Sequence, residues 1–189
     1  MGKILSEIRA ALEKDSSPEA LEAVKQFVPG AENIYGVRMP VINELAKNYK
    51  SGGLELARKL WDSGAYEERM LAAKIIGKSA RKNPARAIEM VKEIAGDIDN
   101  WAICDTIGMQ SLKPLNNKHK DEIFGLSRQL IRSNNFWTRR LALVLVESFT
   151  RHGEQRHEID EILGMLEGEK EYYVQKAISW LKRNFKKRY

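Results

Sequence analysis

The sequence contains a single cysteine, Cys104, among 189 residues. One cysteine excludes an internal disulfide framework and any zinc site built on cysteines, and it favours a reducing cytoplasm as the protein's location. Apolar runs are short, and none approaches the roughly 18–20 residues that span a bilayer. The segment Met1–Lys14 has the pattern of a charged amphipathic helix rather than that of a signal peptide. We therefore expect a cytoplasmic protein with no membrane association.

Motifs of standard catalytic and cofactor sites are also lacking. The sequence has no glycine-rich phosphate loop, no GxSxG nucleophile elbow and no HExxH zinc motif. The three histidines, His119, His152 and His157, have no metal-ligand spacing with one another or with acidic residues. We therefore expect no metal and no small-molecule cofactor, and most standard catalytic chemistries are excluded.

The composition that remains is that of a folded, basic protein. Hydrophobic residues make up 43% and charged residues 31%, which is too apolar for a disordered chain. The formal net charge is +6 and is uneven, because residues 1–99 carry 16 basic and 15 acidic side chains and residues 100–189 carry 16 and 11. Five basic residues fall within Lys182–Tyr189. This charge suits a polyanion partner, and it equally suits a solvated basic tail.

Helical periodicity dominates the whole chain, and no alternating run bounded by Asn-Gly or Asp-Gly turns indicates a strand. Loop residues separate segments of about 10–16 residues, an ordinary helix length. Ser16 or Ser17 before Pro18 is typical of an N-cap followed by proline in the first turn, and Asn83 before Pro84 repeats the pattern. The sequence predicts an all-α protein.

Aromatic residues that recur at nearly constant spacing indicate an internal repeat. Successive steps of 35, 36 and 36 residues separate Tyr66, Trp101, Trp137 and Tyr173. A two-helix unit of this length cannot bury its apolar face alone and has to stack on its neighbours. We expect an α-solenoid of helical hairpins, curved, with one helix of each pair lining a basic concave face. A non-repetitive helical bundle is the alternative. The prediction is one domain over residues 1–189, with repeats from about residue 17 to 186.

The repeat register shows two residues that differ from their equivalents. Four residues after each aromatic stand Met70, Asp105, Leu141 and Ala177, and seven after it stand Ala73, Gly108, Val144 and Trp180. One carboxylate, Asp105, thus takes an apolar position, and one indole, Trp180, takes the position of a modest side chain. Positions zero, three, four and seven share one helical stripe. Trp101 and Asp105 should therefore lie one turn apart, where Arg140 and Trp180 from neighbouring repeats can converge on them.

Each of these residues has a structural interpretation beside the functional one. A carboxylate at an apolar position costs a few kcal/mol if it is buried without partners, and the structural interpretation of Asp105 is an inter-repeat salt bridge to Arg140. Trp101 taken alone is typical of a core aromatic, Trp61 is expected in the core, and Trp137 is ambiguous. The functional interpretation rests on the coincidence of two indoles, a carboxylate and a cation on one stripe.

Together these groups indicate a particular chemistry. Aromatic faces bind cations and sugar C–H edges, a carboxylate stabilises developing positive charge, and arginine with nearby lysines holds phosphate. The combination suits cleavage of an N-glycosidic bond in DNA, whose transition state resembles an oxocarbenium ion. A base made cationic by alkylation leaves as a neutral molecule, so no general acid is needed and a site with few groups suffices.

Four motifs carry a resemblance to a known family: Tyr35–Pro40, Asp99-Asn100-Trp101 with Asp105, Asn135-Phe136-Trp137 with Arg140, and Tyr172–Trp180. Over about residues 20–186 the sequence resembles the bacterial and archaeal DNA alkylation repair family, the DNA glycosylases built from HEAT-like repeats. The resemblance implies excision of positively charged N3- and N7-alkylated purines from duplex DNA, without flipping of the base into a pocket. It also implies a prokaryotic, nucleoid-associated protein, and the lack of heptad repeats favours a monomer.

The resemblance also implies roles for individual residues. Trp101 and Trp180 would contact the deoxyribose of the lesion, and Asp105 would stabilise the sugar cation or position water, so these three are the expected catalytic residues. The expected DNA-binding residues are Arg140, Lys176 and Arg183. The basic tail Lys182–Arg188 is expected to add phosphate contacts. The alternative function is a non-catalytic helical-repeat module that binds nucleic acid or a protein partner on the same concave face.

Overall fold

The computed structural model describes residues 1–151 and 153–186, without the side chain of Lys186. All regular structure in these residues is helical, which confirms the all-α prediction. The α-helices are α1 (Gly2–Lys14), α2 (Pro18–Phe27), α3 (Met39–Asn48), α4 (Gly53–Trp61), α5 (Tyr66–Ser79), α6 (Pro84–Ile94), α7 (Trp101–Thr106), α8 (Lys120–Leu130), α9 (Phe136–Val146), α10 (Arg156–Gly164) and α11 (Tyr172–Lys186). Residues 187 and 188 of the expected basic tail lie outside the described residues.

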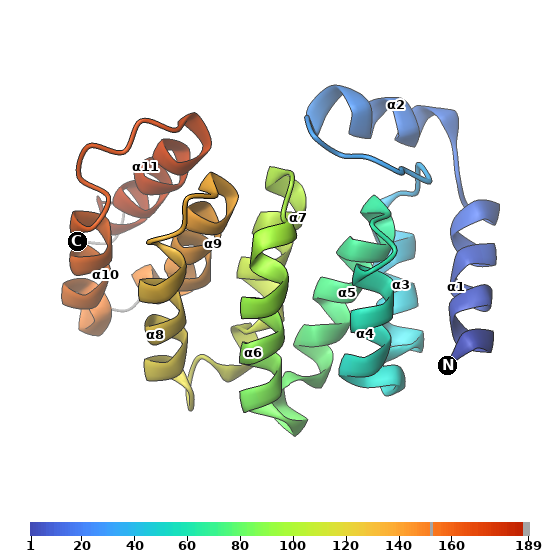
Figure 1. The fold of residues 1–189 in the computed structure, drawn as a ribbon, viewed down its shortest axis with the longest axis horizontal. Coiled ribbons are helices and arrows are strands. Elements are labelled where there is room, and N and C mark those ends of the chain that lie inside the picture. The colour runs from blue at the N-terminus through green and yellow to red at the C-terminus, as the bar shows by residue number, and fades with distance from the viewer. Residues whose placement is uncertain (152, 187–189) are drawn as a thin grey trace.

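From α3 onward the helices form two layers (Figure 1). The helices α4, α6, α8 and α10 lie side by side in one layer, and α3, α5, α7, α9 and α11 lie side by side in the other. Consecutive helices of the two layers form the hairpins α4–α5, α6–α7, α8–α9 and α10–α11. This stack of hairpins is the arrangement of an α-solenoid and confirms that prediction. In the described part of the chain, no helix has the length and apolar character of a membrane span.

The turns of the stack lie on two opposite edges (Figure 1). The turns inside the hairpins, such as that between α6 and α7, lie at the top of the view, and we call this side the intra-hairpin edge. The turns that connect one hairpin to the next, such as that between α5 and α6, lie at the bottom, and we call this side the inter-hairpin edge. The second helix of each hairpin therefore runs from the intra-hairpin edge to the inter-hairpin edge.

The predicted repeat register agrees with the starts of the second helices. Tyr66 and Trp101 are the first residues of α5 and α7. Trp137 and Tyr173 are the second residues of α9 and α11. The four aromatic residues therefore occupy the same place in successive hairpins, at the intra-hairpin edge.

Side-chain caps explain where several helices begin. Ser17 and Asn83 each accept, with a side-chain oxygen, the backbone N–H three residues later at 3.2 Å, and each is followed by a proline. These two predicted caps are confirmed. Asn100 makes the same contact at 3.0 Å. Its cap begins α7, which places Trp101 and Asp105 in the first two turns of that helix.

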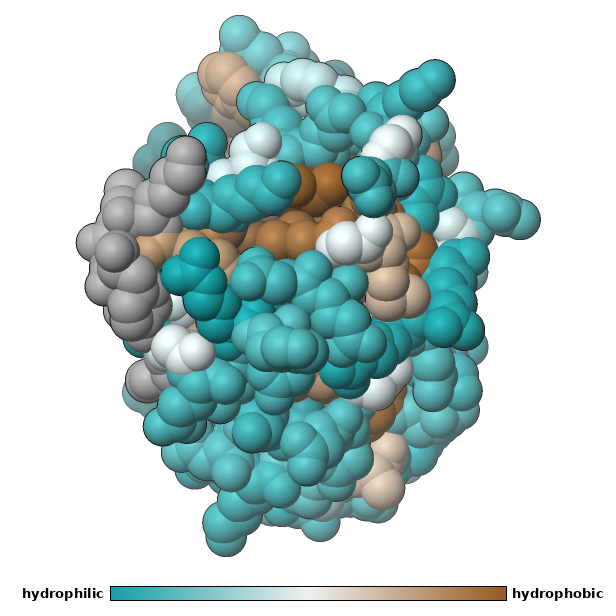
Figure 2. All heavy atoms as spheres, turned by 90° about the vertical axis from the view of Figure 1, so that its left-hand side faces the viewer, coloured by the Kyte–Doolittle hydropathy of each residue, from teal (hydrophilic) through white to brown (hydrophobic). Residues whose placement is uncertain are grey.

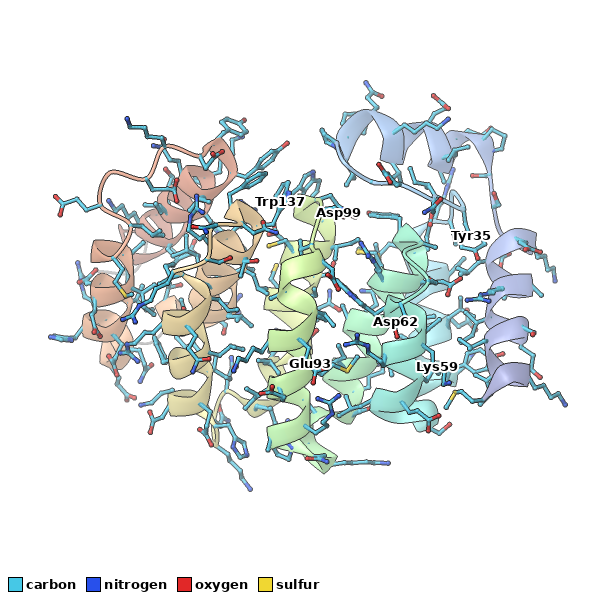
Figure 3. The ribbon with its side chains drawn as sticks, in the orientation of Figure 1. Tyr35, Lys59, Asp62, Glu93, Asp99 and Trp137 are labelled. Atoms are coloured by element: carbon cyan, nitrogen blue, oxygen red, sulfur yellow. The ribbon has the colours of Figure 1, made fainter. Side chains whose placement is uncertain are left out.

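The loop between α2 and α3, residues 28–38, is held by a buried carboxylate. Glu67 in α5 accepts three backbone N–H groups, from Tyr35 at 2.9 Å, from Gly36 at 2.8 Å and from Val37 at 3.1 Å. These bonds offset the cost of burying the charge. Figure 3 shows Tyr35 beside α1 and α2, so the same segment connects the amino-terminal helices with the hairpin stack.

The α10–α11 side of the molecule has an apolar groove. Figure 2 faces this side and shows a hollowed hydrophobic band between hydrophilic rims. A groove of about 590 Å³ lies between the two helices, with Leu163, Leu166 and Ile178 among its lining residues. Its charged lining residues are Asp160, Glu167, Glu169 and Lys182. Among the described residues no further helix covers it, so part of the apolar face of this hairpin is open.

Candidate functional site

Asp105 and Arg140, which the repeat register singled out, are in direct contact. Arg140 Nε donates to Asp105 Oδ1 at 2.9 Å, and Arg140 Nη2 donates to Asp105 Oδ2 at 2.8 Å, which makes a bidentate pair. The third nitrogen, Nη1, donates to the backbone carbonyl of Tyr173 at 2.6 Å. One guanidinium group on α9 thus connects α7 with α11. The inter-repeat salt bridge expected under the structural interpretation is therefore present.

A glycine lets the turn that continues α7, Ile107–Ser111, approach α9 closely. A Cβ on Gly108 would lie 2.6 Å from Val144 Cγ1 in α9 and 2.7 Å from Val144 Cβ. No larger side chain fits there unless the two helices move apart. The small residue at this position of the register therefore lets Asp105, three residues earlier, reach Arg140.

Burial and charge act on Arg140 in opposite directions. Burial lowers the pKa of its guanidinium group, but the hydrogen bonds to Asp105 and the negative charge of Asp105 outweigh it, so the pKa lies above its ordinary value. The side chain of Asp105 is 19% exposed and that of Arg140 is 9% exposed. A carboxylate has about four lone-pair sites. The contacts with Arg140 therefore leave part of the Asp105 carboxylate open to water or to a ligand.

Trp101 begins α7, one turn before Asp105, and is half-buried against the core. Its indole Nε1 donates to the carbonyl of Phe27, the last residue of α2, at 3.0 Å. The segment that follows α2 lies close against the turn before α7. A Cβ on Gly30 would lie only 2.5 Å from the carbonyl oxygen of Asp99. The end of α2 thus sets the orientation of the indole. The ring of Trp101 packs on the core and also stays partly exposed.

Two other tryptophans pack in the interior. Trp61 is 1% exposed, which confirms it as a core residue, and its Nε1 donates to Asp97 at 3.2 Å. Trp137 is also buried, and its ring centroid lies 4.6 Å from that of Tyr173 and 4.8 Å from that of Phe136. Figure 3 shows Trp137 at the intra-hairpin edge. Trp137 therefore joins α9 to α11 as a packing residue, which resolves its ambiguous assignment.

The other predicted residues lie on α11. Trp180 is half-buried, and Lys176 and Arg183 are exposed. The Lys176 Nζ lies 4.9 Å from the centroid of the Tyr172 ring, a cation–π contact. Within residues 1–151 and 153–186, no hydrogen bond, ion pair or ring contact joins Trp180 to the carboxylate–guanidinium pair. The structure therefore brings three predicted residues together on α7 and α9 and holds the other three on α11, the next helix of the layer.

Cys104 has in one hairpin the role that Arg140 has in the next. Cys104 Sγ donates to the carbonyl of Trp137 at 3.6 Å, just as Arg140 Nη1 donates to the carbonyl of Tyr173. In both cases the side chain that stands three residues after a repeat aromatic donates to the backbone carbonyl of the aromatic residue in the next repeat. Burial, and after it the negative charge of Asp105, raises the pKa of Cys104 well above its ordinary value. Cys104 is therefore a neutral packing residue.

A second bidentate pair lies beside the site and was not found from the sequence. Arg139 Nε donates to Glu169 Oε2 at 2.6 Å, and Arg139 Nη2 donates to Glu169 Oε1 at 3.3 Å. The hydrogen bond from Arg139 lowers the pKa of Glu169. The pair ties α9 to the turn before α11. Because Glu169 lies in a turn, outside the helical register, the repeat pattern offered no position at which to expect it.

The Asp105 carboxylate is the group of this site that can act on a ligand. A carboxylate with an open side can stabilise positive charge or orient water. The neighbouring Cys104 is buried as a neutral thiol and offers no nucleophile. In the described residues, no three His, Cys, Asp or Glu side chains gather closely enough to hold a metal ion.

Comparison with known proteins shows which family and which solved structure this chain resembles. The model of a family described as DNA alkylation repair enzyme matches residues 8–189. Among solved structures, a protein described as a predicted DNA alkylation repair enzyme from Enterococcus faecalis is similar, with a TM-score of 0.75 and 17% sequence identity. The match covers 92% of this chain and 84% of that one, and at this identity it shows the fold alone. The search of curated proteins found no match.

Proposed function

The chain belongs to the DNA alkylation repair enzyme family, and from this premise we propose that it hydrolyses the N-glycosidic bond of alkylated purines in duplex DNA. The observation that carries the proposal is the Asp105 carboxylate. It is partly open and rigidly held, and it lies one turn from the indole of Trp101. The substrates we propose are purines that carry a positive charge after alkylation at N3 or N7.

The proposed reaction needs few catalytic groups because the lesion is already activated. When the bond between C1′ and the purine nitrogen breaks, its electron pair goes to the cationic base, which leaves as a neutral molecule. The sugar develops positive charge at C1′ and the ring oxygen. Water then adds at C1′ and loses a proton, so the products are a free base and an abasic site. A fixed negative charge beside C1′ stabilises this transition state more than the ground state.

We assign the roles from the contacts of each residue. Asp105 would face the sugar with the part of its carboxylate that Arg140 leaves open, and would stabilise the cation or position the water. Arg140 would hold Asp105 in place, and N–H groups that its present contacts leave unused could reach a phosphate. The indoles of Trp101 and Trp180 would contact the deoxyribose. Lys176 and Arg183, exposed on α11, would contact the DNA backbone.

One observation favours a second candidate function. Both oxygens of Asp105 accept hydrogen bonds from Arg140, so the carboxylate already has a partner that explains its burial. In this second candidate the protein is a non-catalytic helical-repeat module that binds nucleic acid or a protein partner, and the pair only joins α7 to α9.

Base release from methylated duplex DNA tests the proposal. We expect the wild type to release 7-methylguanine or 3-methyladenine, measured by chromatography of the free bases. Asp105→Asn keeps the shape of the side chain and removes its charge. It should lower the rate of release by about 100-fold or more, while binding to the duplex is largely kept.

Glu169→Gln is the matched control. It removes one carboxylate charge from the neighbouring bidentate arginine pair, and it should leave the rate of release unchanged. Binding by the wild type without any base release would support the non-catalytic module. Full activity of Asp105→Asn would limit Asp105 to a structural role.

A further inference from the structure

Positive charge gathers on the inter-hairpin edge, at the opposite ends of the helices from Trp101. Three successive turns of this edge, residues 47–53, 78–86 and 111–120, contain no Asp or Glu. They contain nine basic residues: Lys47, Lys50, Lys78, Arg81, Lys82, Arg86, Lys113, Lys118 and Lys120. All but Lys120 are exposed. We call these nine residues the basic edge.

Carboxylates do not neutralise the basic edge. Among its nine residues, Arg86 alone forms an ion pair within the described part of the chain, with Glu93. The turns of the intra-hairpin edge from α4 to α11 have the opposite character, with six acidic and two basic residues. The two edges therefore differ in charge from α3 to α8, whereas the last inter-hairpin turn, residues 147–155, contains two acidic residues and one basic residue. A surface such as the basic edge attracts polyanions.

Helix dipoles account for only some of these positions. Cations at helix C-termini are favourable, which suits Lys47 at the end of α3 and Lys78 at the end of α5. Lys118 and Lys120 stand at the start of α8, and Arg86 stands in the first turn of α6, where a cation is unfavourable. A ligand of negative charge would favour cations at both kinds of helix end.

A hollow of about 550 Å³ opens on this edge between the first two turns. Its charged lining residues are Lys50, Glu55, Arg58, Lys82 and Arg86. Glu93 near the end of α6, labelled in Figure 3, accepts from Arg58 of α4 at 3.2 Å and from Arg86 of α6 at 2.6 Å, so these two guanidinium groups are largely neutralised. Lys50 and Lys82 have no carboxylate partner among the described residues. These two lysines therefore supply the unpaired charge of the hollow.

The hollow also holds hydrogen-bond donors without partners. Ser79 is 7% exposed and lines the hollow, and its hydroxyl makes no hydrogen bond in residues 1–151 and 153–186. The N-cap of α4, Gly52, offers no side chain to cap the first turn of that helix. Because no buried side-chain oxygen or nitrogen of the described residues lacks a partner, the Ser79 hydroxyl is open to the hollow and not sealed in the core. An anion seated between the two lysines would accept a hydrogen bond from it.

A second hollow follows the first along the same edge. It measures about 330 Å³, lies between the second and third turns, and has Arg81, Lys118 and His119 among its lining residues. Successive cationic hollows suit a ligand with repeated anionic groups better than a single small anion. We propose that the basic edge binds the phosphate backbone of nucleic acid, with one phosphate seated in the hollow between Lys50 and Lys82.

This surface is separate from the candidate site. Trp101 and Asp105 lie at the intra-hairpin end of α7, while the hollow lies at the inter-hairpin edge, between α4 and the end of α5. The edge offers charge and hydroxyl groups, which bind phosphate without reading bases. Its binding to DNA does not depend on cleavage of an N-glycosidic bond.

The test uses undamaged duplex DNA and two double variants of equal charge. Lys50→Gln with Lys82→Gln removes the two unpaired cations of the hollow. Lys59→Gln with Lys92→Gln removes two exposed cations from the opposite ends of α4 and α6. Dissociation constants are measured by fluorescence anisotropy over a series of salt concentrations. We expect the first variant to bind at least tenfold more weakly and its log–log salt slope to be less steep by about 1.8. The second variant should keep the wild-type slope.

A third variant tests the hydroxyl group. Ser79→Ala should weaken binding up to about tenfold without changing the salt slope, since it removes a donor and no charge. Equal losses in the two double variants would show an effect of net charge alone and would overturn the proposal. Unchanged binding of the Lys50/Lys82 variant would overturn it as well.

Two further arms separate the ligand and the function. Pyrophosphate binding is measured for the wild type and the Lys50/Lys82 variant. If this variant loses affinity for pyrophosphate but keeps its affinity for the duplex, the hollow binds a small phosphate ligand and the assignment to the DNA backbone fails. Binding of undamaged DNA by Asp105→Asn should equal that of the wild type. The edge can thus be established even if no base is ever released, and base release can be established even if the edge is not used.

Discussion

At the scale of single residues, the site depends on a carboxylate with two possible roles. Asp105 occupies a position where the other repeats have Met70, Leu141 and Ala177, so its charge has to be satisfied by a partner. Arg140 is that partner, and its guanidinium group is in turn held by the carbonyl of Tyr173. A rigid carboxylate is an advantage in catalysis, because its charge needs no reorganisation during the reaction. The salt bridge is therefore compatible with both roles, and base release separates them.

A double-mutant cycle measures how strongly the pair stabilises the fold. Arg140→Gln leaves Asp105 unpaired while it is 19% exposed, and we expect a loss of about 2 kcal/mol in the free energy of unfolding. The double variant with Asp105→Asn should lose less than the sum of the single variants, with a coupling energy of about 1–2 kcal/mol. Urea unfolding of the four proteins gives these values. Additive losses would mean that the contact contributes nothing to stability.

At the scale of elements, the second helices are not uniform. α5 continues over 14 residues, whereas α7 has six α-helical residues and then continues as a π-helical turn, Ile107–Ser111. Such π turns are frequent at functional sites. Here the π turn directly follows the two turns that carry Trp101 and Asp105, and it contains Gly108, where α7 approaches α9. The local geometry of α7 and the Asp105–Arg140 contact are thus linked.

Replacement of the contact glycine tests this link. An exposed helical Gly→Ala change normally stabilises a protein. In Gly108→Ala the new Cβ would meet Val144 at 2.6 Å, so we expect a loss of about 2 kcal/mol in the free energy of unfolding and a weaker coupling between Asp105 and Arg140.

Gly125→Ala in α8 is the control, because nothing lies within 4 Å of its added Cβ. It should stabilise the protein by about 0.5–1 kcal/mol. Thermal and urea unfolding of both variants measure these changes in the free energy of unfolding. Stabilisation by Gly108→Ala would mean that the two helices separate easily and that the glycine is not required.

At the scale of the whole molecule, one network joins the amino-terminal helices to the first hairpin. Arg9 in α1 and the hydroxyl of Tyr35 both bind the buried carboxylate of Glu68, while Glu67 binds the backbone around Tyr35. Tyr66 is buried beside these residues at the start of α5. Burial raises the pKa of Tyr35 and of Tyr66 to about 12. Both tyrosines are therefore neutral in the folded protein over a wider pH range than in the unfolded chain.

This difference predicts a loss of stability in alkali. Because the folded pKa of Tyr66 lies above the unfolded value of 10.0, its contribution is fully present below pH 10 and is lost as the pH rises towards 12. The size of the effect is about 2–3 kcal/mol. Urea unfolding from pH 9 to 12 measures it, and Tyr66→Phe should show a flatter decline. Other groups that titrate at high pH contribute equally to the two proteins. Identical declines in the wild type and in Tyr66→Phe would therefore contradict the raised pKa of Tyr66.

Several features of this protein follow from the sequence alone, because they depend on residues that are near in the chain. Helix formation is governed by contacts three to four residues apart, so periodicity and the caps at Ser17 and Asn83 predict the helices. The aromatic spacing predicts where α5, α7, α9 and α11 begin, since the same hairpin recurs. The register also identifies Asp105 as the one carboxylate among apolar equivalents, before any contact is known.

Other features were decided only by the tertiary structure. Asp105 and Arg140 are 35 residues apart, and their contact depends on how closely α7 and α9 pack at Gly108. Glu169 meets Arg139 across a turn that has no helical register. Along the chain the positive charge is an excess in the second half, but the fold brings the basic turns at residues 47–53, 78–86 and 111–120 to one edge, because inter-hairpin turns return to the same side of the stack. Packing between distant segments, rather than local preference, thus determines which charged groups meet and which remain free to bind a partner.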